Sequence, residues 1–301
     1  MQEIDGRTKL AGLLGDPVAH TKSPLIHNTL AQMRGDNLVY VPFHVKQEDL
    51  MQAVKGAHAL GLIGLNVTVP HKSAVIPYLS GTDPLAKAIG AVNTLVYTNE
   101  GYWGYNTDIL GLREAMRRAG FSIEGRRVLL TGAGGAARAV AFLCLFEKAA
   151  AITIANRSVD KAEALAQELQ SFAKDHPDQV ESIPAVAVSL EEAAKGAAGE
   201  DLLAIQCTSV GLAPKADACV FEENAPVFNS IKDAVDLIYE PQKTLFLERV
   251  EKRGGRILNG MDMLLFQGVI AYQLWQNEKD TQIHIPEEIL GCIGEKLSKK
   301  Q

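Results

Sequence analysis

Short apolar runs alternate with segments whose apolar residues recur every three or four positions along most of the chain. The apolar runs predict strands at residues 10–14, 39–44, 64–69, 94–97, 127–131, 152–155, 202–206 and 235–239. Segments with helical periodicity begin near residues 24, 48, 108, 136, 159 and 190. This alternation is typical of an α/β chain in which helices cover parallel sheets.

A domain boundary is expected at the start of the helix that leads from residue 108 to the strand at 127–131, because that strand opens a second series of strands and helices. The predicted domains are residues 1–108 plus 260–301, and residues 109–259. Apolar-faced helices at 261–275 and 286–297 follow the second series without a strand of their own to cover. We therefore expect them to return to the first domain, and a length of 301 residues agrees with two domains.

Composition narrows the class of protein. Hydrophobic residues make up 47% and charged residues 22% of the chain, as in an ordinary globular protein. A net charge of -6 gives no overall positive field for nucleic acid or anionic membrane. The four cysteines are widely spaced and the start of the chain is polar, which favours a cytoplasmic protein without a signal peptide. The histidines show no ligand spacing, so we predict no metal site.

A strand, a glycine turn and a helix start follow one another at residues 128–137. Gly132 permits a tight turn, Gly134 lets backbone amides approach an anion, and Ala137 allows the helix to pack closely on the strand. This order favours a dinucleotide pyrophosphate at the helix N-terminus, although a plain strand-to-helix turn is the alternative. The loop is completed by Ala133, Gly135 and Ala136.

The next strand ends in Asn156, Arg157 and Ser158, at the distance where NAD-preferring sites place an acid for the ribose. Arg157 can stack on adenine and pair with a 2′-phosphate, Ser158 can donate to the same group, and Lys161 lies one helical turn on. The pattern favours NADP over NAD. A solvated arginine beside an N-cap serine is the alternative, and Asp160 keeps NAD use open.

Polar side chains follow the strands of the first domain. Thr21 and Ser23 stand just before Pro24, where both hydroxyls could bind one carboxylate or Ser23 could only cap a helix. Lys72 and Asp108 are candidates to share a proton as hydride leaves carbon. The alternatives are an exposed lysine and an aspartate that caps the helix beginning at residue 109.

Four more polar residues belong to the candidate pocket. Gln267 interrupts an apolar helix face, either as a satisfied buried amide or as a ligand of the pocket. The others stand at or near strand ends: Asn66, Thr68 and Asn93. A polar pocket and a dinucleotide site in one chain together indicate hydride transfer.

Several of these segments, in one order along nearly the whole chain, resemble the shikimate dehydrogenase family. They are residues 15–24, 66–72, 90–94, 106–108, 132–137, 156–158 and 260–267. The resemblance implies reversible, NADP-dependent reduction of 3-dehydroshikimate to shikimate, a step of aromatic amino acid biosynthesis. It also implies that residues 109–259 form a Rossmann-like NADP-binding domain and that the remainder binds substrate.

The resemblance further implies a role for each matching residue. Lys72 would be the catalytic acid/base, Asp108 its partner, and Thr21 with Ser23 the holders of the substrate carboxylate. Leu237 and Gly260 would join the glycine loop in binding the cofactor. The residues around the ring hydroxyls would be Asn66, Thr68, Asn93, Asp108, Tyr239 and Gln267.

Two segments depart from the family pattern. Thr21 replaces the usual serine and leaves the choice between shikimate and quinate open, while Gln206 and Cys207 replace Asn-Ala near the expected nicotinamide. One alternative is a quinate/shikimate dehydrogenase that uses NAD or both nucleotides. Another is a non-catalytic nucleotide-sensing protein, which the joint presence of Lys72 and Asp108 disfavours. We expect a monomer or homodimer without nucleic-acid or membrane partners.

Overall fold

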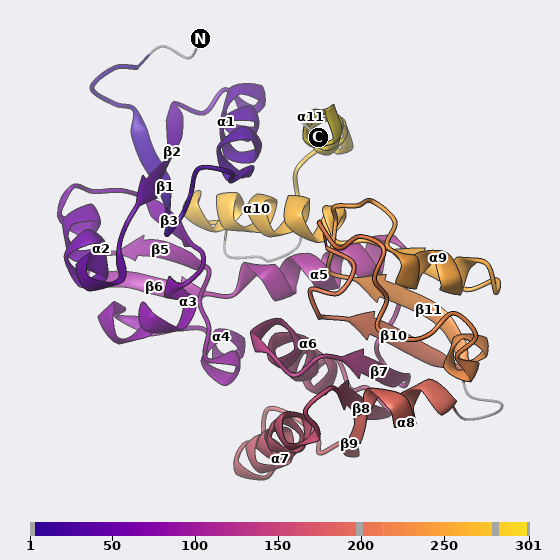
Figure 1. Cartoon of the computed structure of the whole chain (residues 1–301). Helices are drawn as coiled ribbons and strands as arrows, with labels where there is room; N and C mark the ends of the chain where they lie inside the picture. Colours follow the sequence, from indigo (N-terminus) through magenta and orange to yellow (C-terminus); the bar gives the residue numbers. More distant parts are fainter. Residues whose placement is uncertain (1–3, 197–200, 213, 279–282, 300–301) are drawn as a thin grey trace. The chain divides into compact units, whose positions relative to one another are not determined.

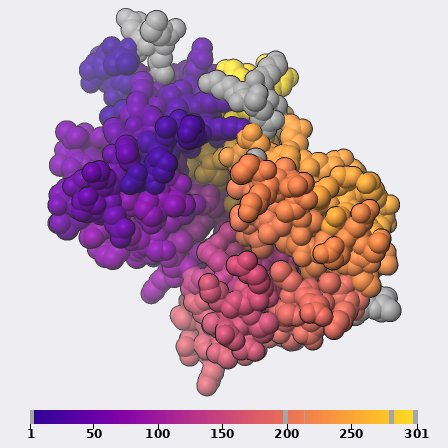
Figure 2. All heavy atoms as spheres, in the orientation of Figure 1, coloured from indigo at the N-terminus to yellow at the C-terminus, as the bar shows by residue number. Residues whose placement is uncertain are grey.

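The computed structural model describes residues 4–196, 201–212, 214–278 and 283–299. The chain divides into two compact units, Met1–Glu114 with Asp262–Gln301 and Ala115–Met261 (Figure 1). Figure 2 shows all heavy atoms as spheres, with most of the first unit in indigo to purple and the second unit in magenta to orange. No helix within the described ranges is long and apolar enough to cross a membrane.

The first unit is built on a six-stranded mixed sheet. Its strands, in spatial order, are β2 (Leu38–His44), β1 (Lys9–Gly15), β3 (Gly64–Val67), β5 (Thr94–Thr98), β6 (Gly101–Tyr105) and β4 (Gly81–Thr82). The pairs β1/β2, β1/β3 and β4/β6 are parallel, but β3/β5 and β5/β6 are antiparallel. The expected all-parallel arrangement is therefore wrong for this sheet.

Strand β6 was not predicted, because two of its five residues are glycines. Close packing explains one of them, since a Cβ on Gly104 would lie 2.7 Å from Leu79 and 2.9 Å from Val92. Strand β3 ends two residues earlier than expected, so Thr68 and the exposed Val69 form a turn after the sheet. Of the substrate residues predicted there, Asn66 lies within β3 and Thr68 directly follows it.

Helices α1 (Ser23–Arg34), α2 (Leu50–Ala59), α3 (His71–Ala74) and α4 (Pro84–Ile89) belong to the first unit, and α5 (Thr107–Arg118) begins in it. The terminal helices α10 (Met261–Trp275) and α11 (Glu287–Lys299) return to this unit as expected, and Figure 1 shows α10 beside its sheet. Trp275 covers Gly64, and its indole Nε1 donates to the Leu95 carbonyl at 2.9 Å. Helix α11 packs on α1.

The second unit contains a six-stranded sheet in which every pair of neighbours is parallel. Its spatial order is β12 (Arg256–Leu258), β11 (Ile231–Asp236), β10 (Leu202–Gln206), β7 (Arg127–Thr131), β8 (Ala151–Asn156) and β9 (Ala185–Ser189). The order of connection runs outward from β7 on one side and from β10 on the other. This is the strand order of a dinucleotide-binding Rossmann fold, with its switch point between β7 and β10.

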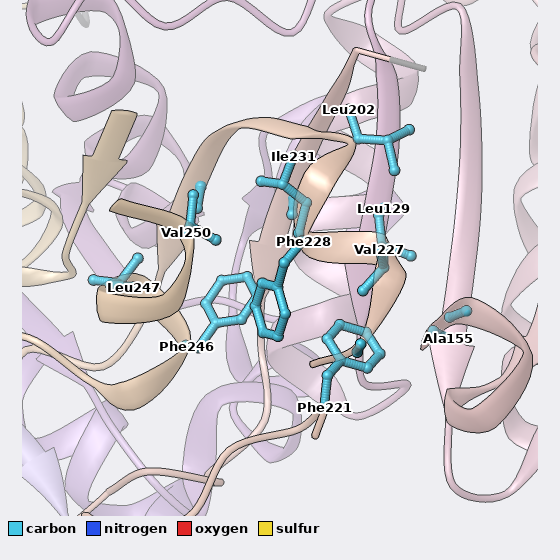
Figure 3. Close-up of a cluster of buried hydrophobic side chains, with 14 residues drawn as sticks. Leu129, Ala155, Leu202, Phe221, Val227, Phe228, Ile231, Phe246, Leu247 and Val250 are labelled. Atoms are coloured by element: carbon cyan, nitrogen blue, oxygen red, sulfur yellow. The ribbon is translucent and has the colours of Figure 1, made fainter. Parts of the chain in front are cut away.

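The helices of this unit are α6 (Gly135–Phe146), α7 (Val159–Asp175), α8 (Leu190–Lys195) and α9 (Leu245–Glu251). Helix α6 contacts β7, α7 contacts β8 and β9, and α9 contacts β11 and β12. Figure 3 shows Phe221, Phe228 and Phe246 meeting aliphatic side chains of the sheet in one buried cluster. This core fixes the strands whose ends carry the candidate nucleotide site.

The predicted strand at 235–239 is wrong by about four residues, because β11 spans Ile231–Asp236. Asp233 concealed it, since a charged residue is not expected inside a buried strand. Its carboxylate is 2.7 Å from Arg126 Nη1 and 2.7 Å from Arg256 Nε, and hydrogen bonds from these guanidinium groups hold the pKa of Asp233 below its usual value despite burial. Strands β9 and β12, at the two sheet edges, were also not predicted.

Candidate active site

Lys72 and Asp108 form the closest acid–base pair among the predicted residues. The Lys72 Nζ lies 2.6 Å from Asp108 Oδ2, and their side chains are 34% and 23% exposed. Lys72 lies in α3, just after β3, and its backbone carbonyl accepts from the Val92 amide at 2.8 Å. The pair is thus anchored through the backbone yet remains accessible to a small molecule.

Asp108 does not cap its helix, so the capping alternative is wrong. The Asn106 side chain takes that place, because its Oδ1 accepts from the Ile109 amide at 3.3 Å. Asn106 also donates from Nδ2 to the Ala91 carbonyl at 3.0 Å. Capping by Asn106 leaves the Asp108 carboxylate free to face Lys72.

Asn93 is buried and its amide has a fixed orientation. Its Oδ1 accepts from the Thr107 amide at 2.7 Å and from the Thr107 hydroxyl at 3.1 Å. A backbone N–H can only donate, so this side of the amide must be the oxygen. The Asn93 Nδ2 donates to no residue in the described ranges, so its hydrogens are available to a ligand.

Asn66 is buried with all four hydrogen-bonding positions of its amide in use. Its Oδ1 accepts from Tyr40 Oη at 2.9 Å and lies 3.0 Å from His27 Nε2. Its Nδ2 donates to the Asn93 carbonyl at 3.2 Å and to Thr94 Oγ1 at 3.1 Å. Asn66 therefore supports Asn93 directly. Its predicted contact with substrate stays a prediction.

Thr21 and Ser23 come together at the start of α1. The Thr21 hydroxyl donates to Ser23 Oγ at 3.1 Å, and the Ser23 amide donates to Thr21 Oγ1 at 3.2 Å. Ser23 makes no capping bond to its helix, whose N-cap position is Lys22. Both partly buried hydroxyls remain near one another, as binding of a single carboxylate requires.

Gln267 lies on α10 opposite α5, and it is almost fully buried. Its Nε2 donates to the Leu264 carbonyl of its own helix at 2.9 Å. Gly111 permits the close approach of the two helices, because a Cβ there would be 2.6 Å from the Gln267 amide nitrogen and 2.8 Å from the Met263 carbonyl oxygen. Gly111 follows Asp108 by one helical turn, so this packing brings Gln267 to the same side of α5.

Thr68 lies between Lys72 and the end of β1. Its amide donates to the Leu14 carbonyl at 2.9 Å, while its methyl group fills the space beside Gly15. The Thr68 hydroxyl makes no hydrogen bond within the described residues. It is partly exposed and thus free to contact a ligand.

The glycine loop of the second unit is open where a phosphate would lie. Gly132 has a φ of 105°, which favours glycine, and a Cβ there would lie 3.2 Å from Thr208. Gly134 and Gly135 are exposed, with nothing within 4 Å of a Cβ position. Ala133 is partly exposed and Ala136 exposed in the first turn of the 12-residue helix α6. The loop fits a dinucleotide pyrophosphate, because exposed glycines with open space around them lie at a helix N-terminus.

Beyond β8, the predicted adenosine-side residues are all at the surface. Asn156 Nδ2 donates to the Ser158 carbonyl at 2.9 Å, which fixes the turn into α7. Ser158 is the N-cap residue of α7, as the alternative interpretation has it, but its hydroxyl makes no side-chain capping bond. Arg157, Ser158 and Lys161 are exposed, as a 2′-phosphate site requires, and Asp160 is exposed beside them.

Gly260 is required by a close approach of two backbones. A Cβ on Gly260 would lie 2.2 Å from the Leu237 carbonyl oxygen, and the Gly260 amide donates to the Ile238 carbonyl at 3.1 Å. Leu237 in turn donates from its amide to the Gln206 carbonyl at 3.1 Å. Tyr239 follows in the same loop of the second unit, where burial raises the pKa of its phenol.

A buried carboxylate supports these loops. Asp236 accepts from Thr244 Oγ1 at 2.6 Å and from the Ile238 amide at 3.0 Å. Gln206 Nε2 donates to the Val210 carbonyl at 3.1 Å, and its Oε1 accepts from the Thr208 amide at 2.5 Å. Burial outweighs these bonds and raises the pKa of Asp236 to about 6. The unusual Gln206 thus has a role in the loop after β10.

Three residues of this site escaped the sequence interpretation. Asn106 stands three residues before Ile109, which is a recognisable capping position. His27 follows Ser23 by one helical turn, but nothing in the sequence points to its contact with Asn66. Gly111 lies in a helical pattern, where a glycine often marks close packing. The described His, Cys, Asp and Glu side chains form no group of three suited to a metal ion.

Comparison with known proteins assigns both units to one family. A shikimate dehydrogenase substrate binding domain matches residues 13–95, and a shikimate / quinate 5-dehydrogenase domain matches residues 113–191. The shikimate dehydrogenase (NADP(+)) of Moorella thermoacetica is 39% identical over 96% of this chain and 95% of its own.

Two solved structures are similar over nearly their whole length. Shikimate 5-dehydrogenase from Listeria monocytogenes, in complex with shikimate and NAD, has a TM-score of 0.85 at 29% identity and covers 99% of each chain. The enzyme from Thermus thermophilus, in complex with NADP(H) and shikimate, has a TM-score of 0.73 at 30% identity, covering 95% of this chain and 98% of its own. On these similarities, the chain belongs to the shikimate dehydrogenase family.

Proposed function

We propose that this chain catalyses the reversible, NADP-dependent reduction of 3-dehydroshikimate to shikimate, as its family relationship suggests. The observation that carries the proposal is the 2.6 Å contact between Lys72 Nζ and Asp108 Oδ2 in the substrate-binding unit. A non-catalytic nucleotide sensor would have no need for an accessible lysine–carboxylate pair among unsatisfied hydroxyl and amide groups. Hydride transfer needs such a pair, because a proton must move at the substrate oxygen.

In the reducing direction, the Lys72 ammonium donates a proton to the carbonyl oxygen while the carbonyl carbon receives a hydride. The product is an alcohol, and the reverse reaction returns the proton to Lys72. The Asp108 carboxylate holds the ammonium in place and stabilises its charge. NADP, when bound, supplies or accepts the hydride.

The remaining first-unit residues would orient the substrate. Thr21 and Ser23 would donate to its carboxylate, and Asn93 Nδ2 would donate to a ring hydroxyl, since its oxygen is already committed to Thr107. Thr68 and Gln267 would contact other ring oxygens. Asn66 is assigned here to the support of Asn93, because its amide is saturated. Tyr239, in the second unit, keeps its predicted substrate contact as a proposal.

The second unit would hold the cofactor. The open amides of Gly134, Gly135 and Ala136 suit a pyrophosphate, and Gly260 with Leu237 would border the nicotinamide. The exposed Arg157, Ser158 and Lys161 suit the 2′-phosphate of NADP, with Asn156 holding their turn. We propose NADP as the preferred nucleotide.

Quinate and NAD form the second candidate pair. Thr21, with its extra methyl beside the proposed carboxylate site, leaves quinate as an alternative substrate, and the exposed Asp160 beside Arg157 leaves NAD as an alternative cofactor. We further propose a cytoplasmic enzyme, a monomer or homodimer. All four cysteines are free thiols, which agrees with a reducing compartment.

The test is a matrix of initial rates with shikimate or quinate and with NADP or NAD, each followed by the appearance of reduced nicotinamide. We expect the highest kcat/KM for shikimate with NADP. A higher value for quinate or for NAD would select the second candidate, and turnover in none of the four combinations would reject a dehydrogenase of either kind.

A further inference from the structure

His27 and Tyr40 lie behind the candidate active site and are buried. Neither has a place in the proposed proton or hydride transfer. Their rings stack with centroids 4.3 Å apart, and Trp275 packs on both. His27 Nε2 and Tyr40 Oη both contact the same atom, Asn66 Oδ1. His27 and Tyr40 therefore together hold the Asn66 side chain.

The directions of the hydrogen bonds that join His27 and Tyr40 to Asn66 are fixed. Asn66 Nδ2 must face the Asn93 carbonyl, because a carbonyl only accepts. Its Oδ1 consequently faces His27 and Tyr40, and both must donate to it. The proton of His27 is therefore on Nε2. Burial lowers the pKa of His27 to about 3, so this ring is a neutral donor across the pH range of ordinary assays.

The Nδ1 of His27 is buried without a hydrogen-bond partner among the described residues. A buried acceptor without a partner destabilises the folded protein, and an apolar side chain would avoid that loss. The folded protein therefore keeps the His27 hydrogen bond to Asn66 despite an unpaired Nδ1. Among the residues that the structure describes, Asn66 is the one polar partner of the His27 side chain.

Further hydrogen bonds connect Tyr40 and Asn66 to two parts of the candidate site. In one direction, Tyr40 is bound to helix α1, which begins at Ser23 of the proposed carboxylate site. Asn28 fixes the Tyr40 backbone to α1 through two bonds of 2.9 Å. In the other direction, Asn66 contacts Asn93, whose Oδ1 accepts from the Thr107 amide directly before Asp108.

We infer that His27 and Tyr40 are positioning residues, which fix Asn66 and through it both Asn93 and the turn that presents Asp108 to Lys72. This inference rests on the proposed function for its catalytic consequence. Neither ring touches substrate in this account. Their effect is to hold Asn93 and Asp108 in one arrangement before substrate binds.

Two substitutions with matched controls test the inference. Tyr40→Phe removes one donor and keeps the stacked ring, whereas Tyr102→Phe removes a buried phenol in the same unit that donates only to the Leu62 carbonyl, at 2.9 Å. His27→Leu removes the other donor, and His27→Gln retains an N–H at a similar reach. All four variants are first checked for folding by circular dichroism.

We expect kcat with shikimate to fall about 10-fold to 100-fold in Tyr40→Phe and His27→Leu, because small displacements of catalytic groups have effects of this size. The KM for NADP should not change. His27→Gln should recover most of the lost kcat, and Tyr102→Phe should behave like the wild type. Wild-type kcat in both donor-removing variants, or an equal loss in Tyr102→Phe, would overturn the inference.

A second readout does not depend on turnover. Hydrogen exchange of the Thr107 amide, followed by NMR, should accelerate in Tyr40→Phe and His27→Leu but not in Tyr102→Phe or His27→Gln. Unchanged exchange in the first two variants would overturn the inference even in an enzyme that is inactive with shikimate. Lack of wild-type activity alone would reject the proposed function instead, so the two failures are distinguishable.

Discussion

The candidate substrate residues and the candidate nucleotide loop are built in opposite ways. In the first unit, the amide oxygens of Asn66 and Asn93 are buried and each accepts more than one hydrogen bond from neighbouring side chains or backbone. In the second unit, Gly134 and Gly135 are exposed and touch nothing around their Cβ positions. One site is held by side chains distant in sequence, and the other by a local turn of backbone.

This difference determines where each site is vulnerable. A site made of side chains fails when one partner is removed, because the others lose their orientation. A site made of backbone amides tolerates most side-chain changes and depends on its glycines and on nearby charges. Substitutions in the two units should therefore affect different kinetic constants.

The largest effect is expected for Asp108→Asn in the first unit. The substitution keeps the shape of the side chain but removes the charge that holds the Lys72 ammonium at 2.6 Å. We expect kcat to fall about 10²-fold to 10³-fold, within the usual range for general acid–base groups. The KM for NADP should change little, as measured by steady-state kinetics.

Asp49→Asn provides the control, because Asp49 is exposed and its side chain makes no capping bond to α2. It should have wild-type kinetics. A comparable loss of kcat in both variants would mean that the effect is one of general charge and not of the Lys72 contact.

A smaller effect, confined to the cofactor, is expected for Arg157→Ala in the second unit. Loss of a hydrogen-bonded charge pair with the 2′-phosphate corresponds to about 1.5–3 kcal/mol, or roughly 10-fold to 100-fold in kcat/KM for NADP. The kcat/KM for NAD should fall much less, because NAD shares the adenine but lacks the 2′-phosphate. Lys174→Ala, which removes an exposed positive charge in the last turn of α7, is the control. Equal losses with NADP and NAD would remove Arg157 from the 2′-phosphate site.

Gly111→Ala should destabilise the first unit. The new methyl group would lie 2.6 Å from the backbone of Gln267, so α5 and α10 must move apart. Overpacking of this kind costs about 1–3 kcal/mol. Gly56→Ala is the matched control in α2, where the new methyl meets nothing within 4 Å.

The two glycine variants are expected to have opposite signs in urea unfolding. Gly56→Ala should stabilise by about 0.5–1 kcal/mol, because alanine is the better helix former. Gly111→Ala should also lower kcat/KM for shikimate through displacement of Gln267. Equal stability of both variants would show that the α5–α10 contact is not tight.

The smallest effect is a pH dependence in the second unit. The pKa of Asp236 is raised from 3.8 to about 6, so between these values the folded chain holds a proton that the unfolded chain has lost. Stability contributed by this group is therefore lost as pH rises through that window, by at most about 1.4 kcal/mol per pH unit. Asp236→Asn should abolish this part of the slope between about pH 4.5 and about pH 6 in urea unfolding.

The sign of the pH dependence of stability distinguishes Asp236 from Asp233 in the same strand. The pKa of Asp233 is lowered by its two arginine partners, so its contribution to stability is lost as pH falls. Identical pH slopes for Asp236→Asn and the wild type would contradict the account of Asp236.

The sequence predicted the elements whose local signals are strong. Helix α10 spans Met261–Trp275 as expected, and β7 and β10 also have the expected bounds, because long apolar runs end there at polar or glycine residues. It missed β6, where glycines conceal a strand, and misplaced β11, where Asp233 is neutralised by arginines from other elements. Such compensation depends on tertiary contacts and leaves no local pattern.

The candidate site likewise has parts that the sequence could predict and contacts that it could not. The glycine loop and the turn at Asn156 could be predicted, because a few consecutive residues determine them. The contact of Lys72 with Asp108 joins residues that are 36 positions apart, and that of His27 with Asn66 joins residues 39 apart. The sequence named Lys72 and Asp108 as candidates to share a proton, but no local pattern showed that they meet, and nothing in the sequence suggested the second contact.

Loss of the Lys72 ammonium should remove the proton transfer that accompanies hydride transfer. The most direct test is the kcat for shikimate oxidation by Lys72→Met at saturating shikimate and NADP, compared with the wild type and with Lys55→Met, a variant of an exposed lysine in α2. We predict a loss of about 10²-fold to 10⁴-fold in Lys72→Met only, with the fold intact. A kcat close to that of the wild type in Lys72→Met would contradict the account.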